Sequence, residues 1–420
     1  MHDVIVVGGG PAGCRAAALI AETGLDVHVF EEHRTIGEPV DCSGVVGAEA
    51  IERIAVPDRI KLAEIRSFRF VSPSGIQFRY AASAPLAYVV DRGALDRELA
   101  ARSIAAGAQF HLGWRVTDLT LRDDSVEIAA FESGERTGRA RACRRIRARM
   151  VVLAGGPRYV LQQKLGMGKP GDFLKTAQVE ISTRGLEETR IFLGSSVAPR
   201  SFAWAVPYRY RGREFARIGV TAKTAGLPYL NEVLNRMRSK GLVDARSFSI
   251  RSWVIPVTPL PRTYAERALA VGDAAGQAKP TTGGGIYYGV ICAEAAAQVA
   301  FAAFEKSDFS ASFLAAYQDQ WRKEIGAEIG VGRLFRLLAE KLENRDIDDL
   351  FRVLRADGVL SSLDKKMRFD WHKELILFAL RHPGMGHVLR RVVLRQANPF
   401  RATQWPRTPR WGEVEVAEGG

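Results

Sequence analysis

The chain has 420 residues, more than one ordinary domain contains, so we expect at least two domains. Hydrophobic residues make up 47% and charged residues 25%, which is typical of a folded globular protein and excludes extensive disorder. The formal net charge of +13 favours an anionic partner, such as a nucleotide cofactor, nucleic acid or an anionic lipid surface, although a basic solubilising surface explains it equally well.

The cysteines and the apolar segments exclude further classes of protein. The four cysteines form no Cys-x-x-Cys pair, so we predict no metal site and no disulfide scaffold, and we favour a cytoplasmic location. We find no signal peptide and no uncharged apolar run of about 18 residues, so we expect no membrane-spanning segment.

The first elements predict a dinucleotide-binding unit. Residues 3–7 indicate a buried strand, residues 14–23 an Ala-rich helix and residues 27–31 a second strand. The glycine-rich sequence between the first strand and the helix fits G-x-G-x-x-G, which lets a pyrophosphate approach the helix N-terminus. A carboxylate at the end of the second strand can accept hydrogen bonds from a ribose. The predicted ligands in this unit are Gly8, Gly10, Pro11, Ala12, Gly13, Glu31 and Glu32.

The middle of the chain predicts strands with few helices. Residues 64–90 indicate strands, 91–107 a helix and 110–131 a strand pair. Seven arginines follow, at 136, 139, 141, 144, 145, 147 and 149, and their spacing favours the solvated face of a hairpin over an anion site. Further strands are predicted at 150–156, across most of 173–258 with a helix near 228–240, and at 268–272.

A second glycine-rich motif narrows the choice of nucleotide. Gly272 and Asp273 are followed by Pro280 and by Gly283, Gly284 and Gly285, and a long helix then begins near Ile286. Asp273 alone also fits a helix N-cap, but its spacing to the proline and glycines favours a binding loop. This pattern resembles the FAD-binding segment of the flavoprotein hydroxylase superfamily.

That resemblance implies an α/β fold and a set of FAD contacts. It implies a Rossmann-type FAD-binding domain (1–65, 90–170 and 260–310) interleaved with a β-sheet substrate domain (66–89 and 171–259), with C-terminal helices (311–420). Asp273 would bind the ribityl chain and the backbone after Pro280 would lie against the flavin ring. The helix N-terminus near Ile286 would stabilise negative charge on the reduced flavin. Arg92 would contact FAD, although it also fits a surface residue at a helix start.

Within this superfamily the chain resembles the geranylgeranyl reductases over roughly residues 1–345. Three segments carry the resemblance, namely residues 39–44 around Cys42, residues 199–207, which resemble P-x-G-Y-x-W-x-F-P, and residues 283–289 with the helical tail that contains Tyr317 and Trp321. The chain departs from the family at four places. Gly155 stands where the family usually has Asp, and Gly284 where it usually has Glu. In the aromatic segment, Ser201-Phe202 replaces Gly-Tyr and Val206 replaces Phe.

The resemblance implies an FAD-dependent reductase that saturates isoprenoid C=C bonds by hydride transfer from reduced flavin. Cys42 would contact the flavin and supply the proton, or it would simply pack in a tight loop. An apolar substrate tunnel would be lined by Phe202, Trp204, Pro207, Tyr287 and Tyr288, which also fit plain core packing. The electron donor would be NADPH or reduced ferredoxin, because no separate nicotinamide-binding unit is visible.

Two other functions compete with the reductase. An FAD-dependent monooxygenase on the same fold is the main alternative, and the W-x-W-x-I-P segment of a halogenase is absent. A non-enzymatic nucleotide or nucleic-acid binder would suit the basic charge, but no DNA- or RNA-binding motif is present, so we expect no nucleic acid partner.

The C-terminal region is predicted to be helical and amphipathic from residue 310 almost to residue 395. Residues 331–411 contain 17 basic and 9 acidic residues, together with Trp371, Phe378, Trp405 and Trp411. Basic helices with aromatic residues favour peripheral contact with an anionic membrane, where an isoprenoid lipid substrate would be found. A solvated helical bundle explains the charge almost as well.

Overall fold

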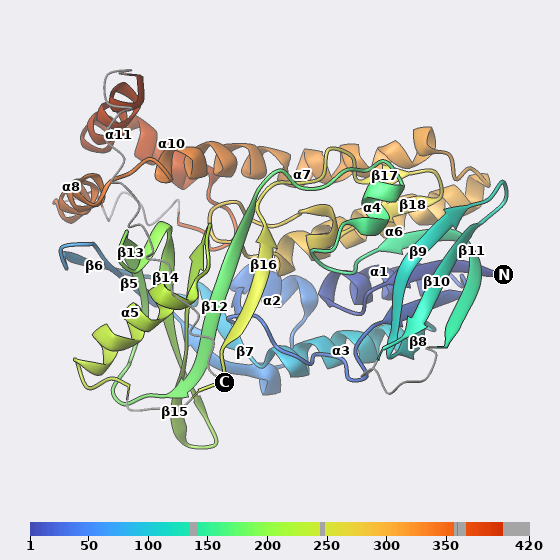
Figure 1. The fold of residues 1–420 in the computed structure, drawn as a ribbon, viewed down its shortest axis with the longest axis horizontal. Helices are drawn as coiled ribbons and strands as arrows, with labels where there is room; N and C mark the ends of the chain where they lie inside the picture. Colours follow the sequence, from blue (N-terminus) through green and yellow to red (C-terminus); the bar gives the residue numbers. More distant parts are fainter. Residues whose placement is uncertain (134–141, 244–247, 357–358, 360–366, 398–420) are drawn as a thin grey trace, which may run out of the picture.

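The computed structural model describes residues 1–133, 142–243, 248–356, 359 and 367–397. The molecule is elongated, with a β-sheet near each end of its long axis and helices α6 and α7 running between the two ends (Figure 1). Arg136, Arg139, Arg141, Trp405 and Trp411, which the sequence analysis singled out, lie outside the described residues.

The first sheet is mixed, and its parallel part is built around the predicted βαβ unit. Its strands run in the order β17 (Tyr264–Ala265), β18 (Ala268–Ala270), β11 (Cys143–Leu153), β1 (His2–Val7), β2 (Val27–Glu31) and β8 (Gln109–Leu112), with β17 antiparallel at the edge. Helix α1 (Pro11–Ala21) connects β1 to β2, as predicted.

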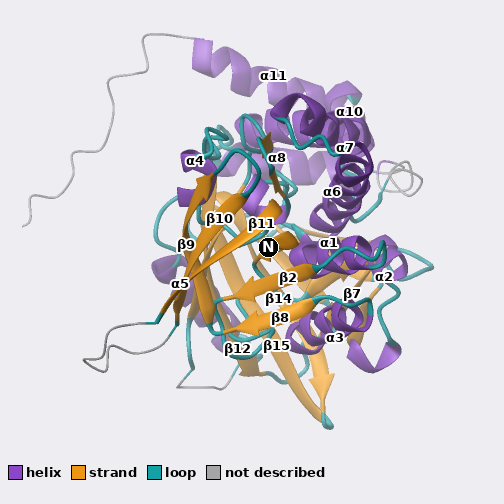
Figure 2. Ribbon diagram, turned by 90° about the vertical axis from the view of Figure 1, so that its right-hand side faces the viewer, coloured by secondary structure: helices purple, strands orange, loops and turns teal. Residues whose placement is uncertain are grey.

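The side chains of alternate residues in these strands are buried on opposite faces of the sheet, as expected for parallel strands covered on both sides. Val4 and Val6 pack with α1, α3 (Arg92–Ala105) and α6 (Ile286–Lys306). Ile5 and Val7 pack with β9 (Trp114–Leu121), β10 (Val126–Glu132) and α4 (Val160–Lys164). Figure 2 shows α1 and α3 together on one side of the strands.

The expected arginine-rich hairpin and the expected buried strand at 150–156 share one strand. In β11, Cys143 to Ala148 pair antiparallel with β10, while Ala148 to Leu153 pair parallel with β1. The side chains of Arg144, Arg145 and Arg147 are exposed on the outer half, in agreement with a solvated hairpin face. The predicted boundary between two elements near residue 149 is wrong, because a change of partner strand leaves no mark on the residue pattern.

The second sheet has seven strands in the order β16, β12, β15, β14, β13, β5 and β6. Their bounds are Arg251–Pro256, Phe173–Ser182, Arg213–Ala222, Ala198–Tyr210, Thr189–Gly194, Ser67–Val71 and Gln77–Ala81. Helix α5 (Leu227–Arg238) covers one face through Leu230, Val233 and Leu234. A three-stranded sheet of β3 (Val45–Gly47), β7 (Ala87–Val90) and β4 (Lys61–Ile65) packs against the other face.

The C-terminal region is helical, as predicted. It contains α7 (Ala311–Ala339), α8 (Asn344–Arg355), α10 (Lys373–Arg381) and α11 (Pro383–Ala397). Among the described residues, α6 alone is long and apolar enough to cross a membrane by length and composition, and 72% of its most apolar window is buried inside the molecule. The domain boundaries expected from the sequence stay a prediction.

Candidate active site

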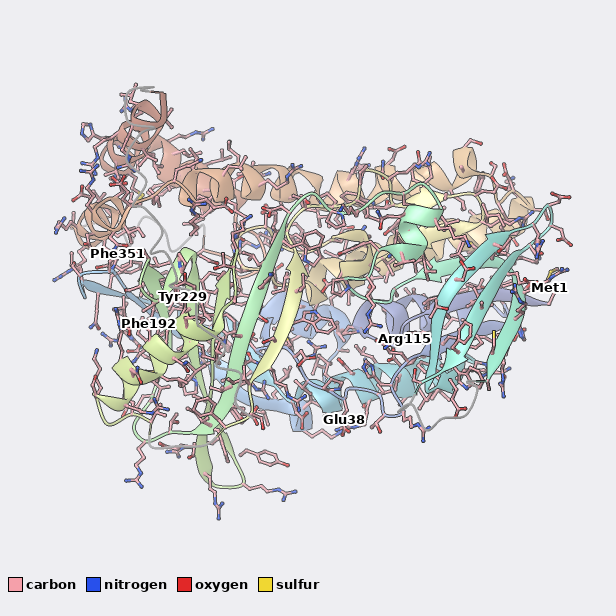
Figure 3. The ribbon with its side chains drawn as sticks, in the orientation of Figure 1. Met1, Glu38, Arg115, Phe192, Tyr229 and Phe351 are labelled. Atoms are coloured by element: carbon pink, nitrogen blue, oxygen red, sulfur yellow. The ribbon has the colours of Figure 1, made fainter. Side chains whose placement is uncertain are left out.

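A cavity of about 1860 Å³ runs between the two sheets and under the C-terminal helices. Its lining includes both glycine-rich loops, the Cys42 loop, the aromatic residues of β14 and side chains from α7, α8, α10 and α11. Arg115 and Phe351 both line it, and Figure 3 shows them far apart along the long axis of the molecule. The cavity therefore joins both glycine-rich loops, the Cys42 loop and the aromatic segment of β14.

The first glycine-rich loop is shaped by close backbone contacts. A Cβ atom at Gly13 would collide with the carbonyl oxygen of Gly8, so only glycine allows α1 to pack this closely on β1. A Cβ atom at Gly10 would meet no atom within 4 Å, because Gly10 faces the cavity. Helix α1 begins at Pro11 with no side-chain cap, so its N-terminal N–H groups are open to a ligand.

Glu31 holds this loop in place. Its Oε2 accepts a hydrogen bond from the Gly9 amide at 2.7 Å, and its Oε1 accepts from the His33 amide at 2.9 Å. Oε1 also lies 2.6 Å from the His33 ring nitrogen Nδ1, so Oε2 is the oxygen that keeps a lone pair free to accept a bond from a ribose. Glu32 is instead engaged by two arginines, Arg115 at 2.6 Å and Arg158 at 2.5 Å, which line the same end of the cavity.

The second glycine-rich loop is braced by α7. Gln277 accepts a hydrogen bond from the Gly272 amide at 2.9 Å and donates one to the Tyr317 hydroxyl at 2.9 Å. Tyr317 in turn donates to the Ala270 carbonyl at 2.7 Å. Helix α6 then begins after Gly285 with no side-chain cap, so a second open helix N-terminus faces the cavity.

Asp273 and Arg92 lie between the two loops. Burial lowers the pKa of the Arg92 guanidinium, but nearby Asp96 and the Cys42 sulfur raise it by more, and Arg92 bonds Asp96 at 3.0 Å. Burial raises the pKa of Asp273 to about 6, and Arg92 opposes that rise. Both side chains line the cavity, and no hydrogen bond to the Asp273 carboxylate is found among the described residues. Asp273 is thus free to bind a ligand hydroxyl.

The Cys42 loop is held from the second sheet. Gln178 on β12 donates to the Cys42 carbonyl at 3.1 Å, and Arg217 on β15 donates to the carbonyls of Ser43 at 3.1 Å and Val90 at 3.0 Å. Arg217 is only 6% exposed and is kept in place by Glu180 at 2.8 Å. The position of the Cys42 thiol in the cavity therefore depends on both sheets.

The aromatic segment of β14 forms one wall of the cavity. Phe202, Trp204 and Val206 alternate along the strand and line the cavity. The Trp204 ring packs against Gly219 on β15, where a Cβ atom would collide with it. Its indole N–H is buried and has no hydrogen-bond partner among the residues that the structure describes. Strands β5, β6 and β13 add Phe68, Phe70, Phe78, Tyr80, Ile191 and Leu193.

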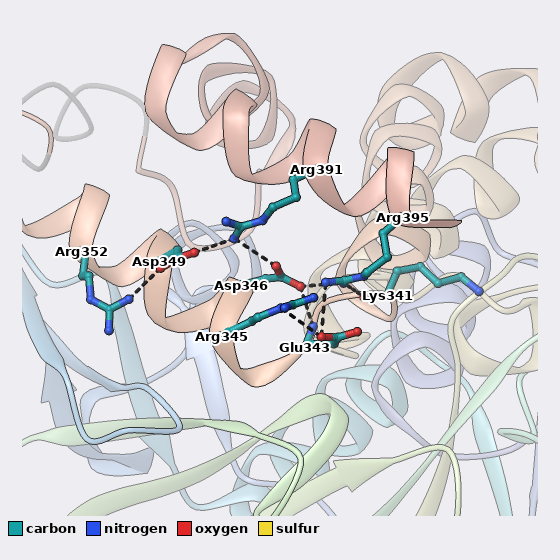
Figure 4. Close-up of polar contacts among 8 residues, drawn as sticks. All are labelled: Lys341, Glu343, Arg345, Asp346, Asp349, Arg352, Arg391 and Arg395. Carbon is teal, nitrogen blue, oxygen red and sulfur yellow. Dashed lines mark hydrogen bonds and ion pairs between the residues drawn. The ribbon is translucent and has the colours of Figure 1, made fainter. Parts of the chain in front are cut away.

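The far end of the cavity is closed by the C-terminal helices, which contribute Leu338, Leu342, Ile347, Leu350, Phe351, Ile376, Met385 and Leu389. A polar network ties these helices together (Figure 4). Asp346, which is fully buried, binds Arg395 at 2.7 Å and Arg391 at 3.1 Å, and so joins α8 to α11.

Most of the predicted site residues line this cavity, including Gly8, Gly10, Pro11, Ala12, Glu31, Glu32, Cys42, Arg92, Gly272, Asp273, Gly283, Gly284, Gly285, Ile286, Phe202, Trp204 and Tyr287. Four others do not line it, namely Gly13, Pro280, Pro207 and Tyr288. Pro207 lies on the opposite side of β14 from Trp204 because side chains alternate along a strand. The Tyr288 hydroxyl donates to the Asp370 carbonyl at 3.2 Å, inside the core.

Sequence reasoning missed Gln178, Arg217, Lys279 and Asp370, which all touch the site. Lys279 carried a usable signal, because it is a charged residue inside a loop of small and apolar residues. The sequence gives no signal for Gln178, Arg217 or Asp370, because each contacts the site only through residues far away along the chain. His2, Asp26 and His28 form a group that could hold a metal ion, but none of them lines the cavity.

The geometry fits an extended dinucleotide such as FAD. Two open helix N-termini, an open face at Gly10 and the Asp273 carboxylate all face one cavity. Gly8, Gly10, Pro11 and Ala12 would hold the pyrophosphate, Glu31 the ribose and Asp273 the ribityl chain.

Comparisons with known proteins agree with this geometry. The FAD binding domain family matches residues 1–329. A digeranylgeranylglycerophospholipid reductase 2 from Methanococcoides burtonii is 31% identical over 365 residues, which are 84% of this chain and 88% of the relative. A protein of the same name from Methanothermobacter thermautotrophicus is 29% identical over 404 residues, 93% of this chain and 100% of the relative.

A solved structure shows the same fold. The crystal structure of a geranylgeranyl bacteriochlorophyll reductase-like protein from Thermoplasma acidophilum has a TM-score of 0.78 at 23% identity and covers 93% of this chain and 99% of that protein. The chain therefore belongs to the FAD binding domain family and is a flavin-dependent oxidoreductase. Within that class it belongs to the geranylgeranyl reductase family, as the sequence resemblance implied.

Proposed function

We propose that this enzyme saturates the C=C bonds of isoprenoid chains attached to a glycerophospholipid or a similar polar head. The observation that carries the proposal is the apolar part of the cavity, which continues from the flavin-binding loops past Trp204 to α8 and α11. An isoprenoid chain offers only apolar surface, and such a lining suits it. The names of the relatives support a reductase over the monooxygenase alternative.

Saturation requires a hydride on one carbon and a proton on the other. FAD, when bound and reduced, supplies the hydride. Cys42 lines the cavity beside Arg92, and we propose that its thiol supplies the proton. Gln178 and Arg217 position the loop that carries it. Phe202, Trp204 and Val206 hold the chain and keep water away from the reacting carbons.

The test uses the full chain loaded with FAD, reduced anaerobically with dithionite and mixed with a geranylgeranyl lipid. We expect the flavin to reoxidise as the lipid gains two hydrogens per double bond, measured by absorbance and mass spectrometry. A flavin that stays reduced until oxygen is admitted would contradict the proposal and favour a monooxygenase.

A pair of variants on one strand sharpens this test. Val206→Asp places a charge in the apolar wall and should abolish lipid reduction while the flavin spectrum is kept, because an uncompensated charge repels an apolar chain. Tyr210→Asp, at the exposed end of the same strand, should leave the rate unchanged. Equal rates in both variants would place the substrate elsewhere.

We also propose NADPH or reduced ferredoxin as the electron donor. Anaerobic mixing of the oxidised holoenzyme with each donor separately should bleach the flavin absorbance with only one of them.

We further propose peripheral contact with an anionic membrane. Helices α7 and α11 carry exposed apolar side chains, with Leu334, Leu337, Val393 and Leu394 between 51% and 69% exposed. Arg333 and Arg390 lie on the same two helices. We expect binding to vesicles that contain anionic lipid and none to neutral vesicles.

A further inference from the structure

Lys279 and Asp370 form an ion pair in the interior of the protein. Their nitrogen and oxygen atoms are 2.7 Å apart, and each side chain is 4% exposed. Lys279 belongs to the loop before Pro280, whereas Asp370 belongs to the segment that precedes α10. The Lys279 ammonium also donates to the Phe369 carbonyl at 3.3 Å and lies 4.6 Å from the centre of the Phe369 ring.

Folding alone does not explain this pair. Removing two charges from water costs about as much as their attraction returns, so a hydrophobic pair of similar volume would stabilise the fold equally well or better. Both residues line the cavity, where perturbed and buried charges are commonly functional.

One oxygen of the pair has no partner in the part of the chain that the structure describes. Asp370 Oδ2 is buried there without a hydrogen bond, and it lies so close to Gly47 that a side chain at that position would collide with it. An unsatisfied buried acceptor costs about 1–3 kcal/mol. Because Oδ2 is closed in by Gly47, the Asp370 carboxylate is fixed in its place beside Lys279.

Lys279 lies directly against the second glycine-rich loop. Its amide donates to the Gly284 carbonyl at 3.0 Å, and a Cβ atom at Gly284 would lie 2.6 Å from Lys279 Cε and 3.0 Å from Nζ. Helix α6 begins at Ile286, so the ammonium and the open helix N-terminus give the same stretch of the cavity a positive potential. Burial, with Lys279 adding to it, lowers the pKa of nearby His372 to about 3, so His372 is neutral at pH 7.

We propose that Lys279 and Asp370 form a charged contact for the flavin ring of FAD, in which the Lys279 ammonium stabilises the negative charge that the ring gains on reduction. Asp370 holds the Lys279 ammonium in place through the 2.7 Å ion pair. The two electrons come from the external reductant and the proton comes from solvent. The proposal rests on the FAD site and is independent of which lipid is reduced.

The experiment measures the reduction potential of the FAD-loaded full chain by anaerobic titration against a reference dye, with no lipid present. Lys279→Met should weaken the preference for reduced flavin at least tenfold, which for a two-electron couple lowers the potential by about 30 mV. Asp370→Asn should raise the potential, because the negative charge that offsets Lys279 is gone. Arg395→Met breaks another buried ion pair, one that does not line the cavity, and should leave the potential unchanged.

Opposite shifts in the two variants are the signature of the proposed role, since damage to the fold would not reverse sign between them. An unchanged potential in Lys279→Met, or shifts of one sign in both variants, would overturn the proposal. Where Lys279→Met does not retain FAD, Asp370→Asn alone decides, because a rise supports the proposal and a fall or no change refutes it. Failure of lipid reduction would refute the proposed substrate and leave this result standing.

Discussion

Around the predicted nucleotide site the cavity wall is mostly backbone, whereas at its other end the wall consists of side chains from four helices. The first region is shaped by glycines. At Gly8 and Gly13 the surrounding backbone leaves no room for a larger residue, whereas the space beside Gly10 is open to a ligand. The second region is held by an ion-pair network around Asp346. A site built from backbone geometry fixes one cofactor, while a wall built from side chains can change its shape by substitution.

The largest effect is expected from a substitution in the part of the cavity whose wall is mostly backbone. Gly13→Ala places a methyl group against the Gly8 carbonyl, so we expect a loss of about 3 kcal/mol in the free energy of unfolding and the loss of FAD. Gly10→Ala is the matched control, since its Cβ atom meets no protein atom. That variant should unfold like the wild type but bind FAD about tenfold or more weakly. Urea unfolding and FAD titration check both, and equal stability of the two variants would contradict this account.

A comparable substitution in the helical region should leave FAD in place. Asp346→Asn removes the buried charge that joins α8 to α11, so we expect a loss of about 3 kcal/mol with FAD content unchanged. Arg352→Ala, at an exposed ion pair on α8, should cost about 0.5 kcal/mol or less. Thermal unfolding with flavin absorbance separates the two effects, and FAD loss in Asp346→Asn would show that the regions are coupled.

Acid should weaken the helical region through the same residue. Burial raises the pKa of Asp346, but Arg395, the Glu343 amide and Arg391 lower it by more, so the net direction is down. The stabilisation is therefore fully present above the unfolded value of about 3.9 and is lost as the pH falls through the folded pKa. In Asp346→Asn this part of the acid dependence should vanish.

The smallest expected effect is a pH dependence of FAD binding. The Asp273 pKa is raised to about 6 by burial, and an ionised carboxylate accepts hydroxyl hydrogen bonds more strongly than the protonated acid does. FAD should therefore bind about tenfold more weakly at pH 5 than at pH 8. Flavin fluorescence titrations measure this, with Asp273→Asn as the flat control. A wild-type affinity independent of pH would remove Asp273 from the site.

The same contrast explains what the sequence could predict. The glycine loops, Glu31 and Asp273 are readable because local backbone geometry demands particular residue types at fixed spacing. The β14 aromatics were found only through their resemblance to a family segment, and strand alternation then decided that Trp204 faces the cavity and Pro207 does not. Arg217 and Asp370 reach the site across 174 and 91 residues of chain, and no local pattern predicts such contacts.

Helix α7 supports the second glycine-rich loop at two points. Near its start Tyr317 bonds Gln277, and near its end Arg336 donates to the Pro280 carbonyl at 3.0 Å, while Gly332 faces the Pro280 ring. Helix α7, which lies beyond α6 in sequence, is thus part of the support of this loop. A truncated chain intended to keep the cofactor site should therefore end after Ala339. A cut near residue 310 would remove all of α7 and with it both points of support.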